Sequence, residues 1–222
     1  MPIQMTEKIL KIRLFKRSPY LPVWERMQQF THNRETNSAD ELWLLEHEPV
    51  FTQGKAGKPE HILNAHNIPV VQSDRGGQVT YHGPGQLMAY TLFDVNRLGL
   101  NTRDFVVMLE KTIIDFLASY GIIARGDRDA PGVYVDSAKI CSIGLRVRKG
   151  YSYHGIALNV AMDLKPFSYI NPCGYAQLKM AQISDTNVNV RFEQARDKII
   201  DYFIKNFGYN ASTILTENEH AV

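Results

Sequence analysis

Apolar residues follow strand-like and helix-like patterns in turn along the chain. Residues 41–46 and 86–95 are largely apolar at successive positions, which predicts two strands covered on both faces. Residues 140–147 and 151–160 predict a β-hairpin, because the three residues between them include Gly150 and can form a short turn. Four further strands are expected, near residues 8–16, 50–52, 122–125 and 132–135.

Three stretches repeat apolar residues at helical spacing. The first covers residues 18–34, with Ser18 as a candidate N-cap and Pro19 as the first helical residue. The same spacing predicts two more long helices, over residues 102–121 and 188–207. Residues expected to cap or end these two helices are Thr102, Gly121 and Gly208. Two shorter helices are expected, at residues 60–66 and 175–182.

This order of elements indicates an α+β fold or a mixed α/β fold, and we expect α+β, with a central, mostly mixed or antiparallel β-sheet flanked by helices. A chain of 222 residues, 44% of them hydrophobic, can bury one sizeable core, and no linker-like stretch divides it. We therefore expect one domain over residues 1–222. Its core should cover about 40–208, and a mostly polar, frayed tail should follow at 209–222.

Composition excludes several classes of protein. A net charge of +2 gives no strong attraction to nucleic acid or to a membrane surface, so neither is an expected partner. No apolar run approaches the length of about 20 residues that crosses a bilayer, and the first residues lack the apolar segment of a signal peptide. Two cysteines are too few for a disulfide framework. The expected location is the cytoplasm, where thiols stay reduced.

The two cysteines lie in different kinds of sequence. Cys141 shares an apolar strand face with Ile143 and Leu145, which is typical of a small core residue. Cys173 follows a proline and precedes a glycine, so it lies on a turn and can point into a cleft. A nucleophilic thiol needs a nearby cation or base, and Lys139 could be that cation. The alternatives are a plain turn cysteine and a lysine that extends from a strand end to water.

A second informative stretch is rich in glycine. Four glycines lie between Gly76 and Gly85, close to Arg75, Tyr81 and His82, so the backbone there could approach a ligand closely. The stretch lacks the pattern of a phosphate loop and that of a dinucleotide-binding fingerprint. Taken alone, a glycine-rich stretch is more often a set of turns than a binding site.

Elsewhere, two histidines five positions apart do not share a helix face. We expect both to be surface residues, and they are His61 and His66.

Four stretches together resemble the octanoyl-[acyl-carrier-protein]:protein N-octanoyltransferase family. They are residues 46–54, 75–86, the hairpin at 139–159 and the turn at 171–174. Each motif is weak alone, but the four occur in the same order as in that family. Two departures are small: Cys141 stands where some members have alanine, and Gln177 stands where a glycine is common.

The resemblance implies a fold similar to the catalytic domains of biotin and lipoate protein ligases. It implies an acyltransferase that takes an octanoyl group from octanoyl-acyl carrier protein. The acceptor is a specific lysine of apo lipoyl domains, such as those of 2-oxoacid dehydrogenase complexes and the glycine cleavage H protein. No metal, nucleotide or other cofactor is implied, because the thioester donor is already activated.

The resemblance also implies roles for individual residues. In that family a cysteine becomes the acyl-thioester, and a lysine lowers the pKa of that cysteine and could act as acid and base. By position these are Cys173 and Lys139. The residues that would line the acyl site are Arg75, Gly76, Gly77, Gln78, Val79, Thr80, Tyr81, His82, Ser142, Ile143, Gly144, Gly155, Ile156 and Ala157.

Three other functions stay open at this point. An ATP-dependent lipoate or biotin ligase would share the fold but would need a nucleotide site. A papain-like hydrolase would pair Cys173 with His154 or His82, although its local signature is absent. A non-catalytic module could bind acyl carrier protein through the basic hairpin turn, which contains Arg146, Arg148 and Lys149.

Overall fold

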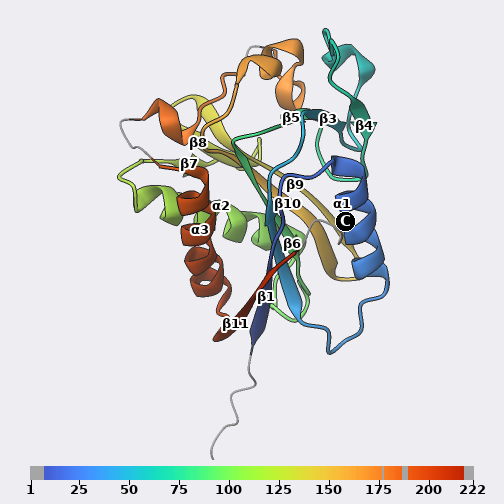
Figure 1. Cartoon of the computed structure of the whole chain (residues 1–222), viewed down its shortest axis with the longest axis vertical. Helices are drawn as coiled ribbons and strands as arrows, with labels where there is room; N and C mark the ends of the chain where they lie inside the picture. Colours follow the sequence, from blue (N-terminus) through green and yellow to red (C-terminus); the bar gives the residue numbers. More distant parts are fainter. Residues whose placement is uncertain (1–7, 177, 187–189, 218–222) are drawn as a thin grey trace, which may run out of the picture.

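The fold is built on an eight-stranded sheet whose strands follow the order β11-β1-β2-β6-β10-β9-β8-β7 (Figure 1). The computed structural model describes residues 8–176, 178–186 and 190–217. Strand β1 is parallel to both of its neighbours, and the remaining pairs are antiparallel, so the expected mixed sheet is confirmed. The strands of this sheet are β1 (Ile9–Leu14), β2 (Asp40–Leu45), β6 (Gln86–Leu92), β7 (Arg125–Gly126), β8 (Gly132–Val135), β9 (Ala138–Arg148), β10 (Tyr151–Asn159) and β11 (Ala211–Thr216).

Helices cover both faces of this sheet. The long helices are α1 (Tyr20–His32), α2 (Thr102–Ala118) and α3 (Phe192–Phe207). In β2, Leu42 and Leu44 point into the core formed with α2 and α3, whereas Trp43 and Leu45 point into the core formed with α1. Strand β6 alternates in the same way. Both strands are therefore buried on both sides, as their continuous apolar runs predicted.

A second, three-stranded sheet lies against one end of the first. Its order is β4-β3-β5, formed by Val70–Gln72, Val50–Gln53 and Val79–His82. Its core contains Phe51 and Tyr81, which pack against Phe167. The single-turn helices η2 (Lys165–Tyr169) and η3 (Pro172–Gly174) lie nearby, and β5 contacts both. The middle of the glycine-rich stretch, Val79–His82, is thus a strand, although the stretch had been predicted to consist of turns or loop.

The predicted helix at residues 175–182 is wrong. Lys179–Ala181 runs as extended chain beside Lys139, whose backbone N–H donates to the carbonyl of Lys179 at 2.8 Å. The carbonyl of Lys139 accepts from the N–H of Ala181 at 2.9 Å. The β8–β9 ladder shifts register at this place, so the backbone of Lys139 needs these other partners. Gln177 lies outside the described residues.

The helix predicted at residues 60–66 is reduced to one turn, η1 (Pro59–His61). The N–H groups of Leu63 and Asn64 both donate to the carbonyl of Tyr169, at 2.9 and 3.0 Å, so they cannot continue a helix. His66 is exposed, as expected, and His61 is half-buried.

Several predicted boundaries also moved. The first turn of α1 follows Pro19 rather than Ser18, and Asn101 rather than Thr102 caps α2, by accepting from the N–H of Asp104. Helix α3 begins at Phe192, and residues 188–189 of its predicted start lie outside the described part. The expected frayed tail is wrong for Ala211–Thr216, which forms β11 because the exposed edge of β1 offers it backbone partners. Residues 218–222 of that tail lie outside the described residues.

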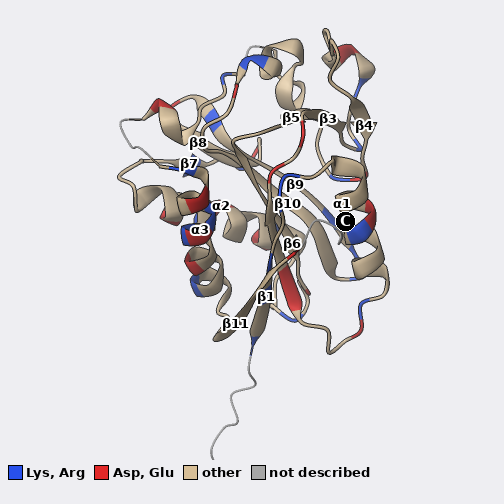
Figure 2. Ribbon diagram, viewed as in Figure 1, with Lys and Arg blue, Asp and Glu red and all other residues tan. Residues whose placement is uncertain are grey.

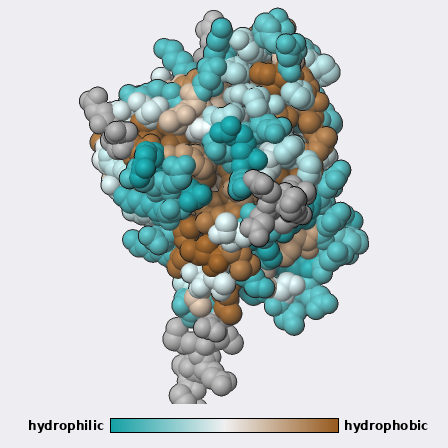
Figure 3. Space-filling model, in the orientation of Figure 1, coloured by the Kyte–Doolittle hydropathy of each residue, from teal (hydrophilic) through white to brown (hydrophobic). Residues whose placement is uncertain are grey.

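Charges and apolar side chains are spread differently over the surface. Figure 2 shows acidic and basic residues interspersed on most elements, consistent with a net charge of +2. Figure 3 shows apolar side chains gathered near the edge of the large sheet, where Ile214 of β11 is 55% exposed. Among the described residues, no helix is both long and apolar enough to cross a membrane.

A buried histidine joins the start of α1 to the sheet. The Nδ1 of His47 lies 2.8 Å from the carbonyl of Ser18, and its Nε2 lies 2.6 Å from the hydroxyl of Tyr90. A carbonyl only accepts, so Nδ1 carries the proton and the Tyr90 hydroxyl donates to Nε2. Burial lowers the pKa of His47 from 6.5 to about 4, so the ring is neutral at pH 7.

We expect His47 alone to make the protein about 3 kcal/mol less stable at pH 4 than at pH 7, because its pKa is about 4 when folded and 6.5 when unfolded. A depressed histidine pKa contributes stability that is complete above pH 6.5 and is lost as pH falls towards 4. Urea unfolding at several pH values measures this. The slope of unfolding free energy against pH should be shallower in His47→Gln, by up to about 1.4 kcal/mol per pH unit. Equal slopes in both proteins would contradict the assignment.

Candidate active site

Cys173 lies on a turn that holds its side chain in a pocket. Its backbone is left-handed, with φ 56°, and Gly174 follows with φ 79°. The turn is fixed because the N–H of Asn171 donates to the carbonyl of His61 at 2.8 Å. A Cβ at position 174 would lie only 2.9 Å from the side chain of Gln78, so the turn packs directly against the residue before β5. A left-handed residue other than glycine is uncommon and often marks a functional position.

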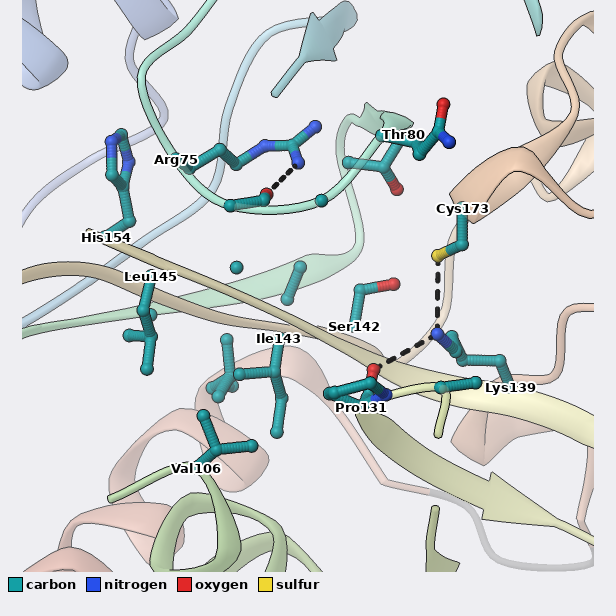
Figure 4. A pocket seen from close by; sticks show the side chains of 18 of the residues that line it. Arg75, Thr80, Val106, Pro131, Lys139, Ser142, Ile143, Leu145, His154 and Cys173 are labelled. Atoms are coloured by element: carbon teal, nitrogen blue, oxygen red, sulfur yellow. Dashed lines mark hydrogen bonds between the residues drawn. The ribbon is translucent and has the colours of Figure 1, made fainter. Parts of the chain in front are cut away.

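Lys139, at the start of β9, points its ammonium at this cysteine (Figure 4). Its side chain donates from Nζ to Sγ of Cys173 at 3.3 Å and to the carbonyl of Pro131 at 3.2 Å. The ring of Tyr134 lies beneath the ammonium, with its centroid 5.1 Å from Nζ. Lys139 is only 2% exposed, which excludes a lysine that extends to water. Within the described part of the chain, it forms no salt bridge with a carboxylate.

The surroundings of Lys139 favour its charged form. Burial alone works against the charge and lowers the pKa, but the thiol group of Cys173 and the phenol of Tyr134 raise it. The net effect is a pKa above the ordinary value for lysine. The pair is therefore arranged as an ammonium that faces the sulfur of Cys173.

Cys141 is a core residue, as its strand pattern predicted. Its side chain is fully buried, and burial raises the pKa of its thiol well above the ordinary value. A neutral, inaccessible thiol is a poor nucleophile.

The Cys173–Lys139 pair lies in a pocket of about 420 Å³. Thirteen of the fourteen residues predicted to line an acyl site lie along it, drawn from the glycine-rich stretch, β9 and β10. The exception is Tyr81. Thr80 and His82 face the pocket, whereas Tyr81 points to the other face of β5, because side chains alternate along a strand. The prediction of Tyr81 as a lining residue is wrong for this reason.

One end of the pocket is closed by almost fully buried residues from distant parts of the chain. They are Tyr20 of α1, Met88 and Tyr90 of β6, His82 of β5 and His154 of β10. His154 has a left-handed backbone with φ 60°, and its Nε2 lies 2.9 Å from Asp74. Sequence reasoning missed Tyr20, Met88 and Tyr90, because each has the pattern of an ordinary core residue in its own element.

Asp74 holds the residues behind this closed end. It accepts hydrogen bonds from Trp24, Tyr153 and His154. Partial burial disfavours its charge, but these donors outweigh burial and hold the pKa of Asp74 well below its usual range. Burial lowers the pKa of His154 despite this carboxylate.

Arg75 is a buried cation held by neutral groups. Its Nε and Nη2 donate to the hydroxyl of Thr52 at 3.1 and 2.9 Å, and its Nη1 donates to the carbonyl of Gly76 at 2.8 Å. The hydroxyl of Thr52 lies 3.0 Å from His82 Nε2, and Gln86 lies 2.8 Å from His82 Nδ1. This chain of contacts fixes the glycine-rich stretch beside β9, where Gly76 N–H donates to the carbonyl of Leu145 at 2.8 Å.

The open end of the pocket lies at Cys173. It is bordered by Tyr175, which is 53% exposed, and by residues from the start of α2 and the segment before β8. Sequence reasoning missed four residues here that line or adjoin the site: Thr102, Val106, Pro131 and Tyr134. The sequence contains only a weak indication of these residues. Val106 and the exposed Val107 are apolar although they lie outside the buried stripe of their helix.

The two histidines that a hydrolase would need, His82 and His154, lie at the closed end of the pocket, away from Cys173. Both ring nitrogens of His82 are occupied by Thr52 and Gln86, and His154 contacts Asp74. Neither histidine contacts Cys173, whose partner is Lys139. Among the described residues, no cluster of histidine, cysteine or carboxylate side chains has the arrangement of a metal site.

Comparison with known proteins identifies the family. Residues 19–204 match the model of the lipoyl protein ligase A/B catalytic domain, and the chain belongs to this family. An octanoyltransferase of Coxiella burnetii (strain Dugway 5J108-111) is 62% identical over 199 residues, which cover 90% of this chain and 82% of that protein. An octanoyltransferase of Pseudomonas fluorescens (strain SBW25) is 55% identical over 208 residues, covering 94% and 97%. The resemblance noted from the motifs is confirmed.

Solved structures show the same fold at low sequence identity. A bipartite lipoate protein ligase from Thermoplasma acidophilum superposes with a TM-score of 0.75 at 17% identity, covering 95% of this chain and 88% of that one. Biotin protein ligase from Aquifex aeolicus, in complex with biotin and ATP, gives 0.56 at 12% identity, covering 90% and 71%. The expected relation to ligase catalytic domains is confirmed for the fold.

We expect iodoacetamide to modify Cys173 and leave Cys141 intact in the folded protein, because Cys141 is fully buried and Cys173 is partly exposed beside an ammonium. Mass spectrometry of peptides from the briefly treated native protein measures this. Cys173→Ala should remain unmodified until the protein is unfolded in urea. Equal modification of both thiols in the native state would contradict the structure.

Proposed function

We propose that this chain transfers an octanoyl group from octanoyl-acyl carrier protein, through a thioester on Cys173, to a specific lysine of apo lipoyl domains. The acceptors are those of 2-oxoacid dehydrogenase complexes and the glycine cleavage H protein. The observation that carries the proposal is the 3.3 Å contact between Lys139 Nζ and Cys173 Sγ at the open end of a pocket. The name octanoyltransferase borne by the relatives supports the acyl group. The E2 lipoyl domain named with the Thermoplasma ligase supports the class of acceptor.

In the first half-reaction, the Cys173 thiolate adds to the thioester carbonyl carbon of the donor. The bond between that carbon and the carrier's sulfur breaks, and the carrier leaves as a thiolate. The Lys139 ammonium is the nearest proton donor, and it converts this leaving group to a thiol. The acyl chain extends towards the closed end, where Ile143, Ile156 and Met88 provide apolar walls.

In the second half-reaction, Lys139 acts in its neutral form. Cys173 no longer carries a negative charge once it is acylated, so burial of Lys139 is no longer offset and its pKa falls. The neutral amine accepts a proton from the acceptor lysine as that lysine attacks the thioester. An amide forms, the Cys173 thiolate leaves, and the ammonium–thiolate pair is restored. Apart from the activated donor and the acceptor lysine, the two half-reactions require only Cys173 and Lys139.

Two alternatives predict different requirements. A ligase would first make an acyl-adenylate and would therefore depend on ATP, as the fold's relatives with bound ATP illustrate. A hydrolase would pass the acyl group to water and would need a base beside Cys173 other than an ammonium. The group beside Cys173 is the Lys139 ammonium, which favours transfer of the acyl group to an amine over hydrolysis. The reaction belongs in the cytoplasm, where both free cysteines stay reduced.

The acyl-enzyme is the direct test. Incubation with octanoyl-acyl carrier protein, without ATP or acceptor, should add one octanoyl group that hydroxylamine removes. Intact-protein mass spectrometry measures the addition. Cys173→Ala should gain nothing, and Cys141→Ala should acylate like the wild type. Addition of an apo lipoyl domain should then move the octanoyl group to one lysine of that domain. Acylation of Cys173→Ala, or a requirement for ATP, would overturn the proposal.

Substitutions of Lys139 should separate its two roles. Lys139→Ala should slow the alkylation of Cys173 at pH 7, because it removes the ammonium that donates to Sγ. Lys139→Arg should recover part of this rate but should still transfer octanoyl slowly from a pre-acylated enzyme, since arginine does not release its proton in this range. Stopped-flow alkylation and single-turnover transfer measure the two effects. Transfer by the arginine variant at the wild-type rate would leave Lys139 with only an electrostatic role.

A further inference from the structure

A groove of about 860 Å³ lies beside the active-site pocket, on the outward side of α2. Its walls are α2 and the loop that joins β7 to β8. Val106, Val107 and Ile114 give it an apolar floor, and Val107 is 55% exposed. Arg103, Lys111 and Arg128 contribute the basic side chains of its lining. An apolar floor with basic margins is the surface that an acidic, amphipathic helix would complement.

The groove is continuous with the open end of the pocket. Thr102, Val106 and Pro131 line both. The carbonyl of Pro131 accepts from Lys139 Nζ at 3.2 Å, so one residue of the groove wall is in direct contact with the catalytic pair. A molecule bound in the groove would therefore lie directly outside Cys173.

The carboxylates that line the groove already accept hydrogen bonds from backbone N–H groups of the β7–β8 loop and β8. Glu110 is 7% exposed and accepts from the N–H of Gly132 at 2.9 Å. Asp127 accepts from the N–H groups of Asp129 and Ala130, at 3.0 and 3.2 Å.

The basic residues differ from one another. Lys111 is paired with Asp115. Arg103 and Arg128 are both exposed and make no ion pair within the described part of the chain. Two unpaired guanidinium groups thus face solvent around an apolar floor, and they would attract an acidic partner.

The direction of the acyl chain explains why a donor must dock on this side. The closed end of the pocket is formed by buried side chains such as Tyr90 and His154, so the acyl chain ends there. The rest of the donor must leave through the open end, next to the groove. The basic hairpin turn at residues 148–150 lies at the other end of β9, roughly 30 Å of strand from Lys139. That turn is therefore poorly placed for the donor.

We propose that this groove docks the acyl carrier protein that delivers the acyl thioester, with an acidic helix of the carrier lying between α2 and the β7–β8 loop. The proposal rests on the function proposed above, because it assigns the surface for that function's donor. Arg103 and Arg128 supply the electrostatic attraction, and Val107 supplies apolar contact.

The test compares a protein donor with a small one. The variant is Arg103→Glu/Arg128→Glu, and the matched control is Arg146→Glu/Arg148→Glu, which reverses the same number of charges on the hairpin. With octanoyl-acyl carrier protein, the groove variant should raise KM at least tenfold at low salt, whereas KM for octanoyl-pantetheine should stay within twofold. The increase should shrink as salt rises, because exposed charges are screened beyond about 8 Å at physiological ionic strength. The hairpin variant should leave both KM values near wild type.

Other outcomes would overturn the docking surface. These are an equal rise in KM for both donors, a rise confined to the hairpin variant, or a rise in KM for the lipoyl domain in place of the donor. Val107→Ser offers a second variant without a charge change, and it should raise KM for the carrier protein alone.

A direct binding measurement distinguishes the failure of this docking surface from the failure of the proposed function. Fluorescence anisotropy with labelled holo-acyl carrier protein measures affinity without turnover, and the groove variant should weaken it at least tenfold. If the wild-type protein transfers no octanoyl group but the groove variant still binds the carrier at least tenfold more weakly than the wild type, the function is wrong and the surface stands. Unchanged affinity in the groove variant would reject the surface even if transfer occurs.

Discussion

A buried ammonium that has no carboxylate partner among the described residues governs the arrangement of this site. Lys139 is 2% exposed, and its Nζ contacts a carbonyl, a sulfur and the face of an aromatic ring. A charge removed from water is costly unless a group of opposite charge or several dipoles compensate it. The sulfur of Cys173 and the phenol of Tyr134 offset the effect of burial and raise the pKa of Lys139. The charge on the lysine therefore depends on its contact with the cysteine, and the walls of the pocket keep the two side chains together.

Two frameworks hold the pair in position, and each joins segments that are distant in sequence. The irregular β8–β9 ladder leaves the backbone N–H and carbonyl of Lys139 without partners in β8. The extended residues 179–181 form hydrogen bonds with both groups. On the opposite wall, Arg75 ties the glycine-rich stretch to Thr52, and Thr52 contacts His82. This second framework works with a neutral imidazole, because burial keeps the pKa of His82 well below its ordinary value. The walls are thus set by hydrogen bonds that do not depend on the substrate.

Local patterns in the sequence predicted the parts of the fold that are decided locally. The continuous apolar runs identified β2 and β6, and the hairpin and long helices followed from spacing and turn residues. The motifs also pointed to Cys173 and Lys139. Tyr20 and Tyr90 could not be found in this way, since only the packing of α1 over β6 brings them to the pocket. The failed helix at residues 175–182 has a similar cause: its conformation is decided by unpaired backbone groups at Lys139, some 40 residues earlier.

The left-handed backbone of Cys173 has a consequence for the thermodynamics of the whole chain. An L-residue in this conformation costs roughly 1–2 kcal/mol, and glycine avoids most of that cost. The turn would therefore be more stable with glycine at position 173, as it already is at Gly174, which has φ 79°. Stability and activity oppose each other at this one residue. Screens that select only for heat resistance would tend to discard the thiol, and a thermostabilised form of this protein should be checked first for the loss of the proposed nucleophile.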